Sequence, residues 1–299
     1  MYKVSHGRHG AMRRALGYAL VMGSLAASVA LAGPSGEYNV IDPDFSSVVP
    51  GTSLIGEGNV QLEANVARAS DGQGTAMTRA WSTPTLVRLG MPNYEVRVLS
   101  SGYSRLRTYS SVDNGMADFQ VGIKGVMPQT FDRDLSMAVV LQAGLPGGSS
   151  QFKQTGFRPE LQLVSAWQLP NANSISGVAG ISSNVDNKGD RYPNGILGLN
   201  FAHGWNPRVS TYAEVAGREI RTASRGGKNM QWSLGGAWKA MPGTQLNASA
   251  GWGIKDNDTD FAWKLGVSRR FRPPSPGAMS KKEDKQPEPT PSATTEDGK

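Results

Sequence analysis

The chain has 299 residues, a formal net charge of +7 and no cysteine, so it can form one large domain or two small ones but no disulfide and no zinc–thiolate site. Four of its 31 basic residues lie in the first 32 positions, which leaves 27 basic against 24 acidic residues in the rest. This near balance, without a basic cluster, excludes nucleic acid as a partner.

The first 32 residues have the features of a secretory signal peptide. Basic residues precede an apolar run at 15–31, and Ala30-Leu31-Ala32 fits the small-x-small cleavage pattern. An uncleaved membrane anchor is the alternative, but the run is short for a span and ends in a cleavage pattern. We therefore expect export and cleavage near Ala32, followed by an N-terminal periplasmic lead at 33–53.

Residues 54–271 are predicted to form a β-barrel because strand-like alternation repeats along this stretch. In 261–271, for example, the odd positions are nearly all large and apolar, and the even positions are small or charged. The small, polar character of the second face is expected of a wet lumen rather than a soluble core. The predicted strands are 54–69, 74–91, 93–109, 115–128, 133–146, 157–169, 173–184, 192–205, 208–222, 228–241, 244–255 and 259–271.

The connections between these segments alternate between two kinds. Short, Pro-containing turns are expected near 91–93, 127–129, 169–171, 206–208 and 241–243, and longer polar loops near 71–74, 112–115, 146–156, 186–190, 224–228 and 256–260. Short turns at one rim and longer loops at the other are typical of outer-membrane barrels. The sequence thus predicts an all-β fold, an antiparallel up-and-down transmembrane β-barrel of about 12 strands.

Tryptophan gives an independent indication of the membrane face. All seven Trp share the parity assigned to lipid, and amphipathic rings of this kind gather at the two bilayer interfaces. The alternative is a soluble β-sandwich that packs its Trp in the core, which would place them in mid-strand. The predicted aromatic girdle consists of Trp167, Trp205 and Trp238 before short turns, and Trp232, Trp252 and Trp263 near long loops.

The last 28 positions, 272–299, form a predicted disordered polar tail. They are rich in Pro, Lys and Glu and contain almost no apolar residues to bury. Phe271, just before this tail, resembles the terminal aromatic residue that barrels present to the barrel-assembly machinery. We expect that machinery and outer-membrane lipid to be partners.

Several short motifs resemble one known family. They include the run Arg88 to Val98 (RLGMPNYEVRV), the strand Gly115 to Lys124 (GMADFQVGIK) and three shorter motifs, LPGG at 145–148, RPEL at 158–161 and YAE at 212–214. The family is that of outer-membrane barrels assigned to the MetA pathway of phenol degradation, and the resemblance covers roughly 55–271. It implies a barrel that passes hydrophobic or aromatic compounds.

Charged residues on the inward parity form the candidate site. Both signs occur on neighbouring strands, so two interpretations stay open: the charges line a pore and select solutes, or they pair into a network that closes the lumen. The predicted lumen-lining residues are Glu63, Arg88, Glu95, Arg97, Asp118, Lys124, Glu160, Glu214, Arg218, Lys239 and Lys264.

No catalytic residue, metal ligand set or cofactor motif is predicted. A barrel phospholipase would need a His beside a Ser nucleophile, and His203 is the one His that follows the signal peptide. It lies on the lipid-facing side of its predicted strand, near a short turn, which is a position that favours an amphipathic ring. We therefore expect a passive channel for small, hydrophobic or aromatic molecules in the outer membrane of a Gram-negative bacterium. A structural or interaction barrel with a closed, salt-bridged lumen is the main alternative, and a barrel enzyme is a weaker one.

Overall fold

The computed structural model describes residues 41–72, 77–128, 134–186, 188–222, 224, 227–254 and 259–271. The predicted signal peptide, the first part of the lead and the predicted tail at 272–299 lie outside the described residues. Within the described part, no helix is long and apolar enough to cross a membrane.

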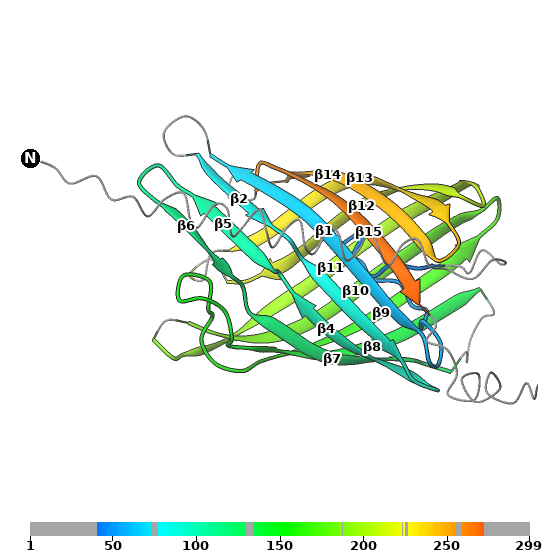
Figure 1. The fold of residues 1–299 in the computed structure, drawn as a ribbon, viewed down its shortest axis with the longest axis horizontal. Helices are drawn as coiled ribbons and strands as arrows, with labels where there is room; N and C mark the ends of the chain where they lie inside the picture. Colours follow the sequence, from blue (N-terminus) through cyan, green and yellow to red (C-terminus); the bar gives the residue numbers. More distant parts are fainter. Residues whose placement is uncertain are drawn as a thin grey trace, which may run out of the picture.

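One antiparallel sheet of 15 strands accounts for the described regular structure (Figure 1). Twelve of these strands form a ring, in the order β1, β3, β4 and then β7 to β15, and pairing of β15 with β1 closes it. The predicted twelve-stranded barrel is therefore confirmed. The strands are β1 (Val60–Asp71), β2 (Thr78–Ser82), β3 (Thr85–Gly90), β4 (Tyr94–Ser100), β5 (Tyr103–Arg107), β6 (Val112–Met116), β7 (Phe119–Val126), β8 (Leu135–Leu145), β9 (Arg158–Leu169), β10 (Asn173–Val185), β11 (Arg191–Asn206), β12 (Val209–Ile220), β13 (Lys228–Met241), β14 (Thr244–Gly253) and β15 (Phe261–Phe271).

The alternation in sequence becomes a difference between the two faces of the ring. In β9, Leu161, Leu163 and Trp167 are exposed, whereas Gln162 and Val164 between them are buried. Side chains alternate across a strand, so the exposed apolar set points out of the ring and the buried set points into it. An apolar outer wall on a closed ring of hydrogen-bonded strands is what a bilayer requires.

Three of the predicted strands are interrupted. The segments predicted at 74–91, 93–109 and 115–128 are split into β2 and β3, β4 and β5, and β6 and β7. Pro84, which has no N–H to donate, lies at the first break, and Gly102, with a φ of 67°, lies at the second. The outer pieces β2, β5 and β6 pair with the end of β1 and with one another, and β6 has β5 as its single partner among the described strands.

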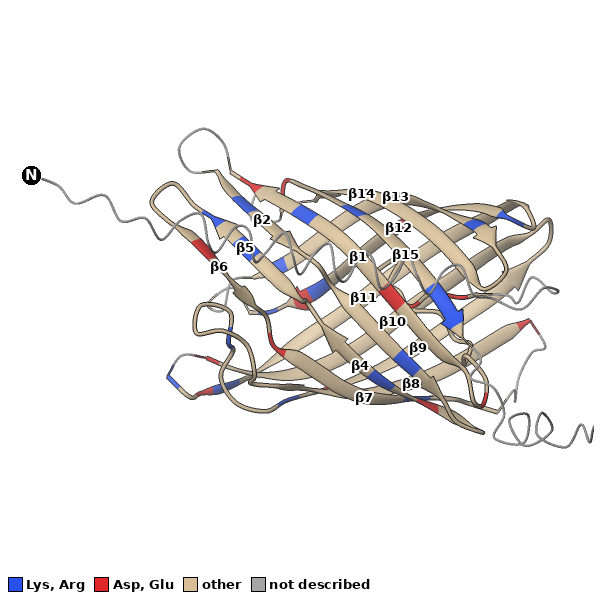
Figure 2. Ribbon diagram, viewed as in Figure 1, with Lys and Arg blue, Asp and Glu red and all other residues tan. Residues whose placement is uncertain are grey.

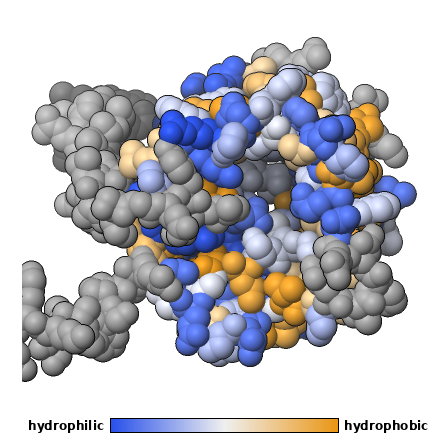
Figure 3. Space-filling model, turned by 90° about the vertical axis from the view of Figure 1, so that its right-hand side faces the viewer, coloured by the Kyte–Doolittle hydropathy of each residue, from blue (hydrophilic) through white to orange (hydrophobic). Residues whose placement is uncertain are grey.

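The two ends of the barrel carry the two predicted kinds of connection. Tight turns join β3 to β4, β9 to β10, β11 to β12 and β13 to β14, and the longer connections, including 146–157, lie at the opposite end. We call these the short-turn end and the long-loop end. Figure 3 looks onto the short-turn end and shows a hollow near the middle of the ring.

Residues 41–55, which precede β1, lie inside the ring, and we call them the plug segment. Ile41, Val49 and Ile55 are buried there, and so is Asp44. The segment crosses the lumen and turns back, since the backbone N–H of Gly51 donates to Asp44 at 3.0 Å. Most of the predicted lead that the structure describes is therefore enclosed by the barrel.

Candidate functional site in the lumen

A buried charge cluster holds the first part of the plug segment. The carboxylate of Asp44 contacts Arg97, lies 3.1 Å from Lys124 Nζ and lies 3.6 Å from Arg88 Nη1. Three strands, β3, β4 and β7, thus direct one cation each at the same anion. All of these side chains are almost fully buried, so the ion pairs act without screening by bulk water.

Arg88 connects the plug segment to the wall. Its guanidinium forms a two-pronged pair with Glu95, at 2.8 and 2.9 Å, and a third contact with Glu63 at 3.2 Å. It also donates to the backbone carbonyls of Asp42 and Ser53, at 2.8 and 3.0 Å. A planar guanidinium with five donors can bind two carboxylates and two carbonyls at once, which the point charge of a lysine cannot do.

Two wall carboxylates bind the backbone of the plug segment directly. Glu63 accepts the backbone N–H groups of Asp44 and Phe45, at 3.2 and 2.8 Å. On the opposite wall, Glu214 accepts those of Val48 and Val49, at 3.0 and 2.9 Å. These bonds provide charged partners for amides that would otherwise be buried without any.

The carbonyl groups between these amides are satisfied from the same side. Tyr212 donates its hydroxyl to Ser46 O at 2.8 Å, and Lys264 donates to Phe45 O at 2.7 Å. A small cavity of about 200 Å³ remains between plug and wall, lined partly by Tyr212, Glu214 and Lys264. The lumen on this side is therefore polar and nearly filled.

The charges around Asp44 determine its ionisation. Burial by itself raises the pKa of this carboxyl, but attraction to Arg88, Lys124 and Arg97 outweighs burial and leaves the pKa well below its ordinary value of 3.8. Asp44 is thus an anion throughout the physiological pH range. Its negative charge balances part of the positive charge that β3, β4 and β7 direct inward.

A row of apolar side chains crosses the inner face of β8 to β12, between buried polar side chains such as Gln162 and Asn194, and contacts the other part of the plug segment. Val164 pairs directly with Ala138 on one side and Val178 on the other, and the row continues across Gly198 to Ala216. Val49 packs here, and a Cβ added at Gly198 would approach its Cγ2 to 2.8 Å. The apolar row is buried throughout and consists of Ala138, Val140, Val164, Val178, Ile196 and Ala216.

A second charged site lies at the long-loop end, where the wall is interrupted between β6 and β7. Asp118 accepts the backbone N–H groups of Gly147, Gly148 and Gln154, at 3.0, 2.8 and 2.9 Å, and pairs with Arg158 at 2.9 Å. Burial raises the pKa of Asp118, but these four hydrogen bonds lower it by a larger amount. The pKa of this carboxyl therefore lies below its ordinary value. The carboxylate thereby holds loop 146–157 against the wall where β6 and β7 are separated.

The structure distributes the predicted lumen residues over several sites. Glu63, Arg88, Glu95, Arg97 and Lys124 meet around the plug segment, and Glu214 and Lys264 hold its other side. Elsewhere, Glu160 pairs with Arg218 at 3.0 Å, Asp118 with Arg158, and half-buried Lys239 makes no ion pair with a described residue.

Sequence reasoning missed Asp44, Tyr212, Arg158 and the apolar row. Val164, Val178 and Ile196 all fall on the inward parity, and this departure from a polar inner face was the available signal. Asp44 gave none, because a single acidic residue in an irregular lead has no periodicity.

The predicted girdle residues lie at the outer surface. Trp167, Trp205, Trp232 and Trp238 are exposed, and Trp232 stacks on Trp252 with centroids 4.5 Å apart. Trp263 meets Trp81 edge to face at 5.4 Å.

His203 contacts an amide and an aromatic side chain. It hydrogen-bonds Asn173 at 2.8 Å and packs against Trp205. The described residues contain no group of acidic and His side chains that could hold a metal ion.

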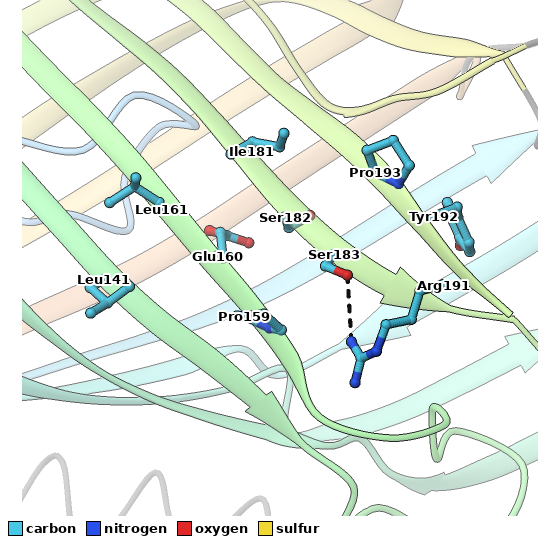
Figure 4. Close-up of a pocket in the computed structure, with 10 residues that line it drawn as sticks. All are labelled: Leu141, Pro159, Glu160, Leu161, Ile181, Ser182, Ser183, Arg191, Tyr192 and Pro193. Atoms are coloured by element: carbon cyan, nitrogen blue, oxygen red, sulfur yellow. Dashed lines mark hydrogen bonds between the residues drawn. The ribbon is translucent and has the colours of Figure 1, made fainter. Parts of the chain in front are cut away.

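A separate hollow of about 390 Å³ lies on the outer face of β8 to β11 (Figure 4). Leu141, Leu161 and Ile181 lie side by side across its wall, and Arg191 donates to Ser183 Oγ at 3.4 Å at its edge. These apolar side chains point away from the lumen, so the hollow belongs to the lipid-facing surface.

A closed ring with an apolar outer wall, a largely polar interior and a plug segment defines an outer-membrane β-barrel. The chain matches the family described as "Putative MetA-pathway of phenol degradation" over residues 35–271, and it belongs to that family. No curated protein matches it in sequence.

One solved structure shares the fold with a TM-score above 0.5, and others show a weaker likeness. An outer membrane channel from Pseudomonas putida F1 has a TM-score of 0.59 at 12% identity, covering 78% of this chain and 100% of that one. The NanC porin has a TM-score of 0.47 at 13% identity, and the match covers 70% of this chain and 98% of the porin. The Pseudomonas putida toluene transporter TodX has a TM-score of 0.37 at 11% identity, and the match covers 71% of this chain and 89% of TodX.

Proposed function

We propose that the protein is a passive outer-membrane channel for small, apolar or aromatic molecules, and that the plug segment closes its lumen at rest. The observation that carries this proposal is the apolar row on the inner face of β8 to β12. A lumen that served only ions or sugars would gain nothing from such a surface, because apolar area facing water is unfavourable.

The plug segment explains how such a surface is kept from water. Val49 covers the apolar row while the amides beside it bind Glu214. If the segment withdraws, the apolar row lines one wall of the lumen and a polar wall faces it. An aromatic molecule carrying one hydroxyl could then contact both walls at once.

The family supports the chemistry of this cargo, since its description names phenol degradation. Phenol is a small aromatic ring with one polar group. The lumen offers matching surfaces, apolar on the side of Val178 and polar on the side of Tyr212 and Lys264.

A barrel that is permanently closed is the second candidate. The buried cluster of Asp44 with Arg88, Arg97 and Lys124 favours it, because breaking buried ion pairs is costly. The two candidates differ in one measurable respect, which is whether any solute crosses the barrel.

Uptake of radiolabelled phenol by bacterial cells that produce the protein tests the proposal. We expect uptake above that of cells without it, faster uptake when residues 41–53 are deleted, and slower uptake in the deletion carrying Val164→Asn and Val178→Asn. Ser233→Asn, at a buried position on the polar side of the lumen, is the matched control. Heat-dependent gel mobility confirms folding of each variant, and uptake equal to that of empty cells in every folded variant would contradict a channel.

A further inference from the structure

Four arginines gather on the outer face of the barrel at the long-loop end, and we call them the arginine patch. They are Arg68 on β1, Arg79 on β2, and Arg105 and Arg107 on β5. Strand register places them side by side: Arg68 and Arg105 both pair with Trp81, and Arg79 pairs directly with Arg107. Figure 2 shows the positive charge on β2 and β5 at this end.

The parity of β1 shows that the arginine patch points out of the ring. Glu63 and Asn65 are buried toward the lumen, whereas Val66 is exposed on the other face, and Arg68 follows on that same face. The register of β1 with β2 and of β2 with β5 has no bulge, so the other three arginines share this orientation. Their charges therefore face the membrane side and not the lumen.

No acidic partner on the described chain neutralises this charge. None of the four arginines forms an ion pair with a described residue; Arg68 lies over the Trp81 ring at 5.3 Å, and Arg79 Nε contacts the Met77 sulfur at 3.1 Å. The nearby acids Asp71 and Asp113 pair with Thr78 and Leu106, which are on the opposite parity.

The direct pairing of Arg79 with Arg107 is unfavourable by itself. Like charges directly opposite on neighbouring strands repel each other. An anion bound between them would turn this repulsion into attraction, and a guanidinium pair matches the geometry of a phosphate group.

The position of the arginine patch indicates the source of that phosphate. Trp81 and Trp263, which meet edge to face beside Arg68, are typical of the boundary between hydrocarbon and headgroups. The long loops of such barrels face the cell exterior, so this boundary belongs to the outer leaflet. Its phosphates are those of lipopolysaccharide.

We propose that the arginine patch is a binding site for the phosphorylated headgroup of lipopolysaccharide, with the apolar surface below it contacting the acyl chains. Basic residues at a membrane surface attract anionic headgroups, and their contributions accumulate. The bound lipid would stabilise β2, β5 and β6, which extend beyond the interrupted part of the wall.

Binding of lipopolysaccharide to the full-length protein in detergent tests this site. We expect Arg79→Gln with Arg107→Gln to weaken binding about tenfold or more, since each basic residue near a lipid surface contributes about fivefold in affinity. The matched control is Lys153→Gln with Lys188→Gln, which removes the same charge from exposed loop positions at the same end.

Lipopolysaccharide stripped of its phosphates should bind the unmodified protein at least as weakly as intact lipopolysaccharide binds the double arginine variant. Inorganic phosphate should not compete, because it lacks the acyl chains. Unchanged affinity of the folded arginine variant, equal loss in the lysine control, or full competition by inorganic phosphate would each overturn the proposal.

Discussion

Asp44 concentrates the attachment of the plug segment in one side chain. Its carboxylate contacts cations from three strands, and its backbone N–H donates to Glu63. Removing one member of such a cluster leaves the other charges buried without their partner, which costs about 3–5 kcal/mol. The free energy of docking thus depends on a residue that lies outside every strand.

Replacing Asp44 by Asn should therefore release the plug segment. We expect hydrogen exchange at the amides of Phe45, Val48 and Val49 to accelerate by at least about a hundredfold, which corresponds to about 3 kcal/mol. Exchange measured by mass spectrometry reads this directly. Asp42→Asn, two residues away, changes a contact with Ser53 at 2.7 Å and should have little effect. Similar exchange in both variants would show that Asp44 does not hold the segment.

The pH dependence of docking follows from the same carboxylate. The pKa of Asp44 is lowered on docking, so its contribution is fully present above the ordinary value of 3.8 and is lost as the pH falls through the docked value. After division by the intrinsic exchange rate at each pH, the protection of these amides should fall on acidification below pH ~4 in the unmodified protein, and this fall should be smaller in Asp44→Asn.

The attachment of loop 146–157 to the interrupted wall depends on Asp118. Asp118→Asn loses the charge-assisted bond to Arg158 and weakens three backbone contacts, and bonds to charged groups contribute about 1.5–3 kcal/mol. The loop should open more often, so we expect trypsin to cleave after Lys153 roughly ten times faster or more. Asp113→Asn at the same end is the control, and equal cleavage in the two variants would argue against an attachment through Asp118.

The strands and turns of the ring could be predicted from the sequence, but the breaks in the wall and the docking of the plug segment could not. Alternation and two kinds of turn predicted the ring, because lipid imposes a regular apolar parity on each spanning strand. The breaks near Pro84 and Gly102 escaped prediction, since the residues on both sides keep a strand-like pattern. The docking of residues 41–55 escaped it too, because their contacts with Glu63 and Glu214 are made mainly by backbone amides, which every sequence has.

Closure of the barrel rests on the pairing of β1 with β15. Val66 and Leu265 are direct partners on the exposed outer face of this seam, and the chain has no natural cysteine. Val66→Cys with Leu265→Cys should form a disulfide, because directly opposed Cα atoms lie within the usual disulfide range. Val66→Cys with Val267→Cys is out of register by two residues and should link poorly.

A non-reducing gel measures the outcome. The linked chain is a covalent loop, so after heating it should migrate differently from its reduced form, and the out-of-register pair should show no such difference. Efficient linkage of both pairs, or of neither, would contradict the closed register.

The plug segment is attached on both sides of this seam. It contacts β1, β3, β4 and β7 on one side, and β12 and β15 on the other. If β1 and β15 separated, Glu214 and Lys264 would move away with one side of the sheet while Glu63, Arg97 and Lys124 kept their contacts with the segment, so the enclosed segment resists opening of the seam.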